Sequence, residues 1–131
     1  MSNKLDKILA EISAGELIDK ITILEIKKVK INDSNKLKEI EKELLSLNNT
    51  LKIYIPDLSK IHSQTINLKS VNLKLWDVEN EKRIAEKNNN FDEKFIKLAR
   101  SVYKNNDERA KIKLEINNIL ESNIREVKSH F

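Results

Sequence analysis

The chain has 131 residues with one glycine, one proline and no cysteine, and 35% of its residues are charged. So little glycine and proline excludes the turns of an all-β fold and the glycine-rich loop of a P-loop or Rossmann fold, and the lack of cysteine excludes disulfides, cysteine-ligated zinc and thiol nucleophiles. The 25 basic and 21 acidic residues are mixed along the sequence, as on a solvated helical surface, so we expect no nucleic-acid partner despite the net charge of +4.

Apolar residues at the helical period predict a first helix over residues 14–30. It begins at a capping box, in which the Ser13 hydroxyl accepts from an amide of the first turn and Glu16 reaches back. Its apolar residues include one stripe, formed by Leu17, Ile18, Ile21 and Leu24. Three more, Ile23, Ile26 and Val29, lie outside this stripe. A helix that is apolar on more than one side is either the most buried helix of the chain or packs against a second copy of the chain. Both outcomes stay open, and we expect a homo-oligomer formed through this helix.

Three more helices are predicted, with short connections between them. The second covers residues 35–54 and ends before Pro56, which cannot continue it. Proline near a first turn then opens a long third helix over 57–87. The fourth helix runs from residue 93 to beyond Leu120.

Together these elements predict an all-α protein, an antiparallel four-helix up-down bundle with long third and fourth helices. We assign residues 13–131 to this single domain. Leu5, Ile8 and Leu9 have helical spacing, but the segment 1–12 is short and its structure stays open. The last residues, 129–131, are expected to fray.

The sequence gives no sign of a membrane segment. No stretch of 18 residues is both apolar and uncharged, so we expect no transmembrane helix and no membrane insertion. Residues 1–7 lack the apolar run and the cleavage site of a secretory signal. We therefore expect a cytoplasmic location.

Polar residues occupy positions in the last two helices where the apolar pattern predicts core. They are Asn72, Glu79, Arg83 and Glu86 in the third helix and Asn106, Arg109, Lys113 and Asn117 in the fourth. If the two helices are antiparallel neighbours, Trp76 lies level with Tyr103, and Lys69 with Arg109. Buried charge is unfavourable unless it is paired, so these groups either satisfy one another or line a wet pocket that receives a ligand.

Both interpretations stay open at this point. In the structural one, Glu79 and Arg83 pair along their own helix, and long basic side chains reach solvent from the core line. In the functional one, cations and amides bind an anionic or polar metabolite beside a flat aromatic wall. The ligand-binding residues of this second hypothesis are Lys69, Asn72, Trp76, Glu79, Arg83, Tyr103, Asn106, Arg109 and Lys113.

Other chemistry has less support. Glu16, Asp19 and Glu25 match part of the carboxylate set that binds Mg²⁺ in helical nucleotide pyrophosphohydrolases, but those enzymes need carboxylates that converge from adjacent helices. Asp19 with Lys20 is interpreted as a solvated pair. The two histidines are expected on the surface, and no Ser-His-Asp arrangement is present. We predict no metal site and no cofactor.

Several sequence blocks resemble a small family of unknown function found in bacteria and their phages. The first block, at residues 13–27, reads SAGELIDKITILEIK, and the second includes Asn72, residues 75–79 and Arg83. The most specific block consists of LARSVY at 98–103, NDERA at 106–110, Lys113 and EIN at 115–117. With EVKS at 126–129, the resemblance extends from Ser13 to Ser129.

This resemblance implies a standalone helical module with no assigned activity or cofactor. It also implies relatives joined to, or near, repeat proteins and glycosyltransferases of cell-surface polysaccharide synthesis. The matching residues are rich in charged and amide side chains, which favours a polar ligand site. A more remote similarity to helical chorismate mutases carries over no catalytic residue, because the spaced arginines of their first helix are missing here.

We therefore expect a small non-catalytic binding or adaptor module with an inter-helix polar pocket. Its ligand would be an anionic metabolite or a sugar-phosphate-like molecule, and the resemblance suggests a link to surface polysaccharide synthesis. One alternative is a helical enzyme acting on an anionic substrate, either mutase-like with Lys113 or Glu79 as the acid/base, or similar to the Mg²⁺-dependent pyrophosphohydrolases. The other alternative is a purely structural oligomerising scaffold.

Overall fold

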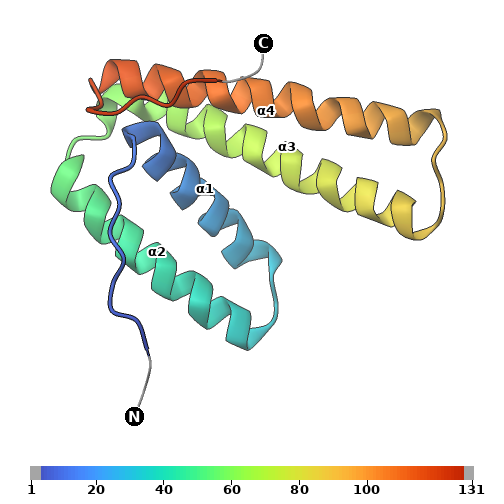
Figure 1. Cartoon of the computed structure of the whole chain (residues 1–131), viewed down its shortest axis with the longest axis horizontal. Helices are drawn as coiled ribbons and strands as arrows, with labels where there is room; N and C mark the ends of the chain where they lie inside the picture. Colours follow the sequence, from blue (N-terminus) through green and yellow to red (C-terminus); the bar gives the residue numbers. More distant parts are fainter. Residues whose placement is uncertain (1–3, 129–131) are drawn as a thin grey trace.

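The computed structural model describes residues 4–128, and over this range the chain forms four α-helices, one short 3₁₀ turn and no strand (Figure 1). The elements are α1 (Ala14–Lys30), α2 (Ser34–Tyr54), η1 (Ser59–Ile61), α3 (His62–Lys87) and α4 (Glu93–Ile119). The predicted all-α fold is confirmed, and α3 and α4 are the longest helices. The fraying expected at residues 129–131 concerns residues outside the described range.

Side-chain caps set the starts of the helices. Ser13 Oγ accepts from an amide of the first turn of α1 at 3.1 Å, as the capping box predicts. Asp33 and Asp92 each accept from two amides at the starts of α2 and α4. The start of α3 differs from the prediction, because the separate turn η1, whose Ser59 amide donates to Asp57 at 3.0 Å, precedes it and the helix proper begins only at His62.

The end of α4 reverses the chain. The helix stops at Ile119, slightly earlier than predicted, because Glu121 has a positive φ of 50° and the Ser122 amide donates back to the Asn117 carbonyl at 2.8 Å. After this reversal, residues 123–128 run back along α4 (Figure 1).

Two helical hairpins make up the fold. α1 and α2 form one hairpin, α3 and α4 form the other, and the first lies obliquely against the second (Figure 1). α1 packs against all three other helices, whereas α2 packs mainly on α1. The far ends of α3 and α4 extend beyond α1, so the centre of the molecule is the place where α1 meets the second hairpin.

The apolar core lies at this meeting place. Its central cluster consists of Ile18, Ile61, Leu68, Val71, Ile112 and Ile116. α1 contributes more buried residues than any other helix in the described range. α1 is therefore the most buried helix of the described range, which was the first of the two outcomes expected for it, although Val29 on its second apolar side is exposed.

Residues 4–13 have no regular secondary structure. Leu5, Ile8 and Leu9 keep helical spacing, but their side chains are largely exposed to solvent. A segment this short gains too little from its own hydrogen bonds to stay helical without a packing partner. Within residues 4–128, no helix combines the length and the apolar character needed to cross a bilayer.

Gly15 allows the first turn of α1 to touch α4. A Cβ atom at this position would lie well inside the van der Waals distance of the Lys113 carbonyl oxygen and 2.9 Å from Oδ1 of Asn117. The Gly15 amide donates to that same Oδ1 at 2.6 Å. The single glycine of the chain is therefore a close-approach position between two helices.

We predict that Gly15→Ala lowers the free energy of unfolding by about 2 kcal/mol or more, because a backbone oxygen must move to admit the methyl group. The loss outweighs the gain of roughly 0.5–1 kcal/mol that alanine brings to an exposed helical site. Urea denaturation followed by circular dichroism measures the change.

The matched control is Asn35→Ala, which changes the corresponding exposed position in the first turn of α2. It should shift stability by less than about 0.5 kcal/mol. Equal effects of the two substitutions would contradict the close approach at Gly15.

Candidate functional site

A buried carboxylate joins three helices. The side chain of Asp19 in α1 is 0% exposed. Its Oδ1 accepts from Nδ2 of Asn72 in α3 and from Nε of Arg109 in α4, both at 2.9 Å, and a second nitrogen of the guanidinium bonds Oδ2. Thr22 Oγ1 accepts from the same amide nitrogen at 2.9 Å and donates to the Asp19 carbonyl at 2.8 Å. Full pairing offsets much of the penalty for burying this charge.

Asp19 belongs to a stripe of buried residues that runs along one face of α1. Gly15, Asp19, Thr22 and Ile26 follow one another at intervals of four and three residues, and all four are buried. Gly15 and Asp19 meet α4, and Thr22 meets α3. The small and polar residues of α1 therefore face the second hairpin.

Lys113 of α4 is a second charge within the fold. Its side chain is 11% exposed, and its Nζ lies 2.5 Å from Glu16, 2.8 Å from Glu126 and 4.0 Å from Asp19. Burial lowers the pKa of Lys113, but the hydrogen bonds to Glu126 and Glu16 and the charges of Glu16 and Asp19 together raise it above its ordinary value. The hydrogen bond to Asp19 likewise raises the pKa of Arg109 against the effect of burial. Both side chains are cations at neutral pH.

Three of the nine predicted site residues meet here: Asn72, Arg109 and Lys113. The Asp19 carboxylate holds them together, and it is the group that sequence reasoning misjudged. Asp19 was expected to form a solvated pair with Lys20, and that prediction is wrong because the carboxylate is buried. Lys20 pairs instead with Glu16 at 3.6 Å.

The polar seam does not extend along the whole second hairpin. Glu79 pairs with Lys82 at 3.4 Å and with Arg83 at 3.9 Å, and the Arg83 side chain is 79% exposed. Lys69 pairs with Glu25 at 3.7 Å on the surface. These pairs are the solvated ion pairs of the structural interpretation.

The remaining three predicted residues take no part in the buried network. Trp76 is half-buried, whereas Tyr103 and Asn106 are exposed. Asn106 lies near the network only through its Oδ1, which accepts from Arg109 at 3.5 Å. The flat aromatic wall predicted for the pocket is therefore absent from the surroundings of Arg109 and Lys113 described here.

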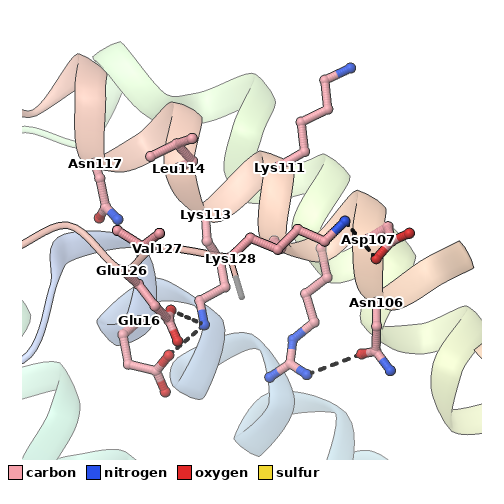
Figure 2. Close-up of a pocket in the computed structure, with 12 residues that line it drawn as sticks. Glu16, Asn106, Asp107, Lys111, Lys113, Leu114, Asn117, Glu126, Val127 and Lys128 are labelled. Carbon is pink, nitrogen blue, oxygen red and sulfur yellow. Dashed lines mark hydrogen bonds and ion pairs between the residues drawn. The ribbon is translucent and has the colours of Figure 1, made fainter. Parts of the chain in front are cut away.

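A groove runs along α4, beside the start of α1. It has a volume of about 800 Å³ and lies beside the chain segment 126–128 that returns over the helix (Figure 2). Lys128 of this segment pairs with Asp107 of α4 at 2.9 Å. The groove is lined by Glu16, Asn106, Asp107, Arg109, Ala110, Lys111, Lys113, Leu114, Asn117, Glu126, Val127 and Lys128.

Asn117 presents a buried donor without a partner in this groove. The residue is fully buried, and its Oδ1 is occupied by the Gly15 amide. Its Nδ2 is the one buried side-chain nitrogen or oxygen within residues 4–128 that has no hydrogen-bond partner. Figure 2 shows the amide end of Asn117 directed from α4 toward the side where Glu126 and Val127 pass.

The backbone N–H groups in the first turn of α1, close to Asn117, already donate to acceptors within the chain. The Ala14 amide donates to Ser122 Oγ at 3.0 Å, and the Glu16 amide donates to Ser13. The start of α1 therefore offers no free amide cluster to an anion, and the groove's donors are the side chains of α4.

The three carboxylates compared with an Mg²⁺ site are paired with lysine or arginine side chains. Glu16 and Asp19 face Lys113 and Arg109, and Glu25 lies apart from them. Within residues 4–128, no group of three or more metal-ligating side chains is arranged to hold a metal ion. His62 is exposed, and the other histidine, His130, lies outside the described residues.

A sequence profile of a family of unknown function, DUF6165, matches residues 8–130. The chain belongs to the DUF6165 family. This confirms the resemblance to a family of unknown function that the sequence blocks indicate. No curated protein and no solved structure matches the chain. Membership of DUF6165 supplies no activity, so a function is argued from the buried network and the groove.

We predict that Asp19→Asn destabilises this DUF6165 protein by about 2–4 kcal/mol, because it leaves the charge of Arg109 without its buried partner. The amide is almost the same size as the carboxylate, so the loss reports charge and not packing. Urea denaturation measures the effect.

Asp77→Asn removes the same charge from an exposed position of α3 and serves as the control. It is expected to change stability by less than about 0.5 kcal/mol. A similarly small effect of Asp19→Asn would show that the carboxylate does not hold the three helices together.

Proposed function

We propose that this chain is a small binding protein for an anionic metabolite. The groove between α4 and the returning segment 126–128 holds the ligand by its carboxylate or phosphate oxygens. The proposal keeps the anion-binding role expected from the sequence and moves the site from the seam between α3 and α4 to the groove along α4.

The unpartnered Nδ2 of Asn117 is the observation that carries this proposal. Buried donors in native proteins are almost always paired, so one that is left over marks the place of an acceptor. Rotating the amide by 180° would not remove the excess donor, because Nδ2 would then face the Gly15 amide, which is itself a donor. The missing partner is therefore an oxygen acceptor on the groove side.

The charge of the groove supports an anionic acceptor. Lys113 lies one helical turn before Asn117, and Arg109 lies one turn before Lys113, so the three side chains project from one face of α4. Lys111 and Lys128 add two further cations, so the lining holds four cations and three carboxylates. The volume of about 800 Å³ falls within the range of small-molecule sites.

Binding is favoured over catalysis by the state of the proposed acid/base residues. Lys113 has a raised pKa, so its ammonium stays protonated and cannot accept a proton at neutral pH. Glu79, the other acid/base candidate, pairs with Lys82 and does not line the groove. Lys113 is therefore not a general base at neutral pH, and Glu79 does not reach a ligand in the groove.

A purely structural role is the second candidate, and a specific observation favours it for part of the site. Asn72 and Asp19 satisfy each other and make no contact with the groove. We therefore assign Asn72 to the framework and keep only Asn106, Arg109 and Lys113 of the predicted residues in the proposed site. Self-association, a cytoplasmic location and a link to surface polysaccharide synthesis stay predictions.

Asn117→Asp tests the proposed function. One carboxylate oxygen can still accept from the Gly15 amide, while the donor toward the groove becomes a negative charge. Because this charge is buried, circular dichroism first establishes that the variant is folded. We expect inorganic phosphate, succinate or a hexose phosphate to shift the amide signals of residues 109–117 in NMR spectra of the wild type. We expect the variant to bind the same compound at least about tenfold more weakly.

Asn118→Asp is the matched control, because it adds the same charge at an exposed neighbour whose Oδ1 accepts from Arg125. It should leave the affinity within about threefold of the wild type. The proposed function fails if none of the three compounds shifts these signals at concentrations up to about 10 mM.

A further inference from the structure

Lys113 is surrounded by more negative charge than one ammonium neutralises. Three carboxylates lie within 4.0 Å of its Nζ, those of Glu16, Asp19 and Glu126. Glu16 and Asp19 belong to α1, and Asp19 is also held by Arg109. Glu126 belongs to the returning segment, which has no helix or strand. Glu126 is therefore the most easily exchanged of the three partners.

The returning segment is fastened mainly by exposed polar contacts. Lys128 pairs with Asp107 and Arg125 bonds Asn118, in both cases at 2.9 Å on the surface. The Glu126 side chain is itself well exposed at its contact with Lys113. Exposed ion pairs of this kind contribute little to stability and weaken with added salt.

Apolar anchoring of the segment is weak. Val127 lies between the two ion-paired residues, and its side chain is 86% exposed. Ile124 is also exposed. Since no buried apolar side chain secures the segment beyond Ser122, it can leave α4 without opening the core.

The Glu126 carboxylate has the chemistry expected of the ligand. It is an oxyanion bound to the least exposed cation of the groove, at 2.8 Å from Nζ. A free carboxylate or phosphate that binds Lys113 would require the same position, because Glu16 already occupies another side of the ammonium (Figure 2).

We infer that the position of the Glu126 carboxylate on Lys113 is the oxyanion subsite of the groove, and that the returning segment is a strap that a ligand displaces. This inference rests on the proposed function. An oxyanion enters by taking the place of Glu126 on Lys113, and its remaining oxygens lie toward Nδ2 of Asn117. The affinity measured for a ligand is then reduced by the fraction of molecules in which the strap is bound.

Glu126→Gln tests the subsite, with Glu121→Gln as the control for the same change of charge at an exposed residue just before the segment. The probes are inorganic phosphate and succinate, titrated separately into each protein and followed by NMR. We expect Glu126→Gln to bind at least one probe about threefold or more tightly than the wild type, and Glu121→Gln to match the wild type. The preferred probe distinguishes a phosphate subsite from a carboxylate subsite.

Amide relaxation of residues 124–128 provides the second readout. We expect these residues to gain fast motion in Glu126→Gln without a ligand, and in the wild type once phosphate or succinate is bound. If the wild type binds a probe and Glu126→Gln binds it equally or more weakly, the strap inference is overturned while the proposed function stands. If neither protein binds either probe, the inference is rejected, and the hexose phosphate titration then decides the proposed function.

Discussion

The pairing of the buried Asp19 carboxylate with Arg109 is the interaction on which the rest of the structure depends. It links the centre of α1 to α4, and through Asn72 the same carboxylate reaches α3. A charge without exposure to solvent has to be met by donors of fixed geometry, so it sets how the first hairpin lies on the second. Apolar packing around Ile18 and Ile116 stabilises this arrangement but is far less directional.

The network also determines which donor side chains remain for a ligand. Arg109 and Asn72 are occupied by Asp19, so the interior seam is a framework and not an open pocket. One and two helical turns beyond Arg109, α4 carries Lys113 and Asn117, which line the groove. Gly15 connects the two regions, because its close approach to α4 fixes the amide of Asn117 and leaves Nδ2 for another partner.

Much of the fold could be predicted from the sequence, because helix periodicity and capping are local properties. Ser13 marks the start of α1, and the periodic apolar residues define four helices. The site was harder to predict, since its central contact joins residues 90 positions apart in the sequence. Asp19 resembles a surface residue beside Lys20. Three of the four residues of its stripe, Gly15, Asp19 and Thr22, are small or polar, so an apolar pattern does not reveal the stripe.

A double-mutant cycle between Asp19→Asn and Arg109→Gln tests most directly whether this buried pair organises the helices. Each single variant and the double variant would be unfolded in urea, and their free energies of unfolding compared. The account predicts a coupling energy of about 2 kcal/mol between the two positions, because each single substitution leaves a partner unpaired inside the fold. Additive effects, with a coupling energy below about 0.5 kcal/mol, would contradict it.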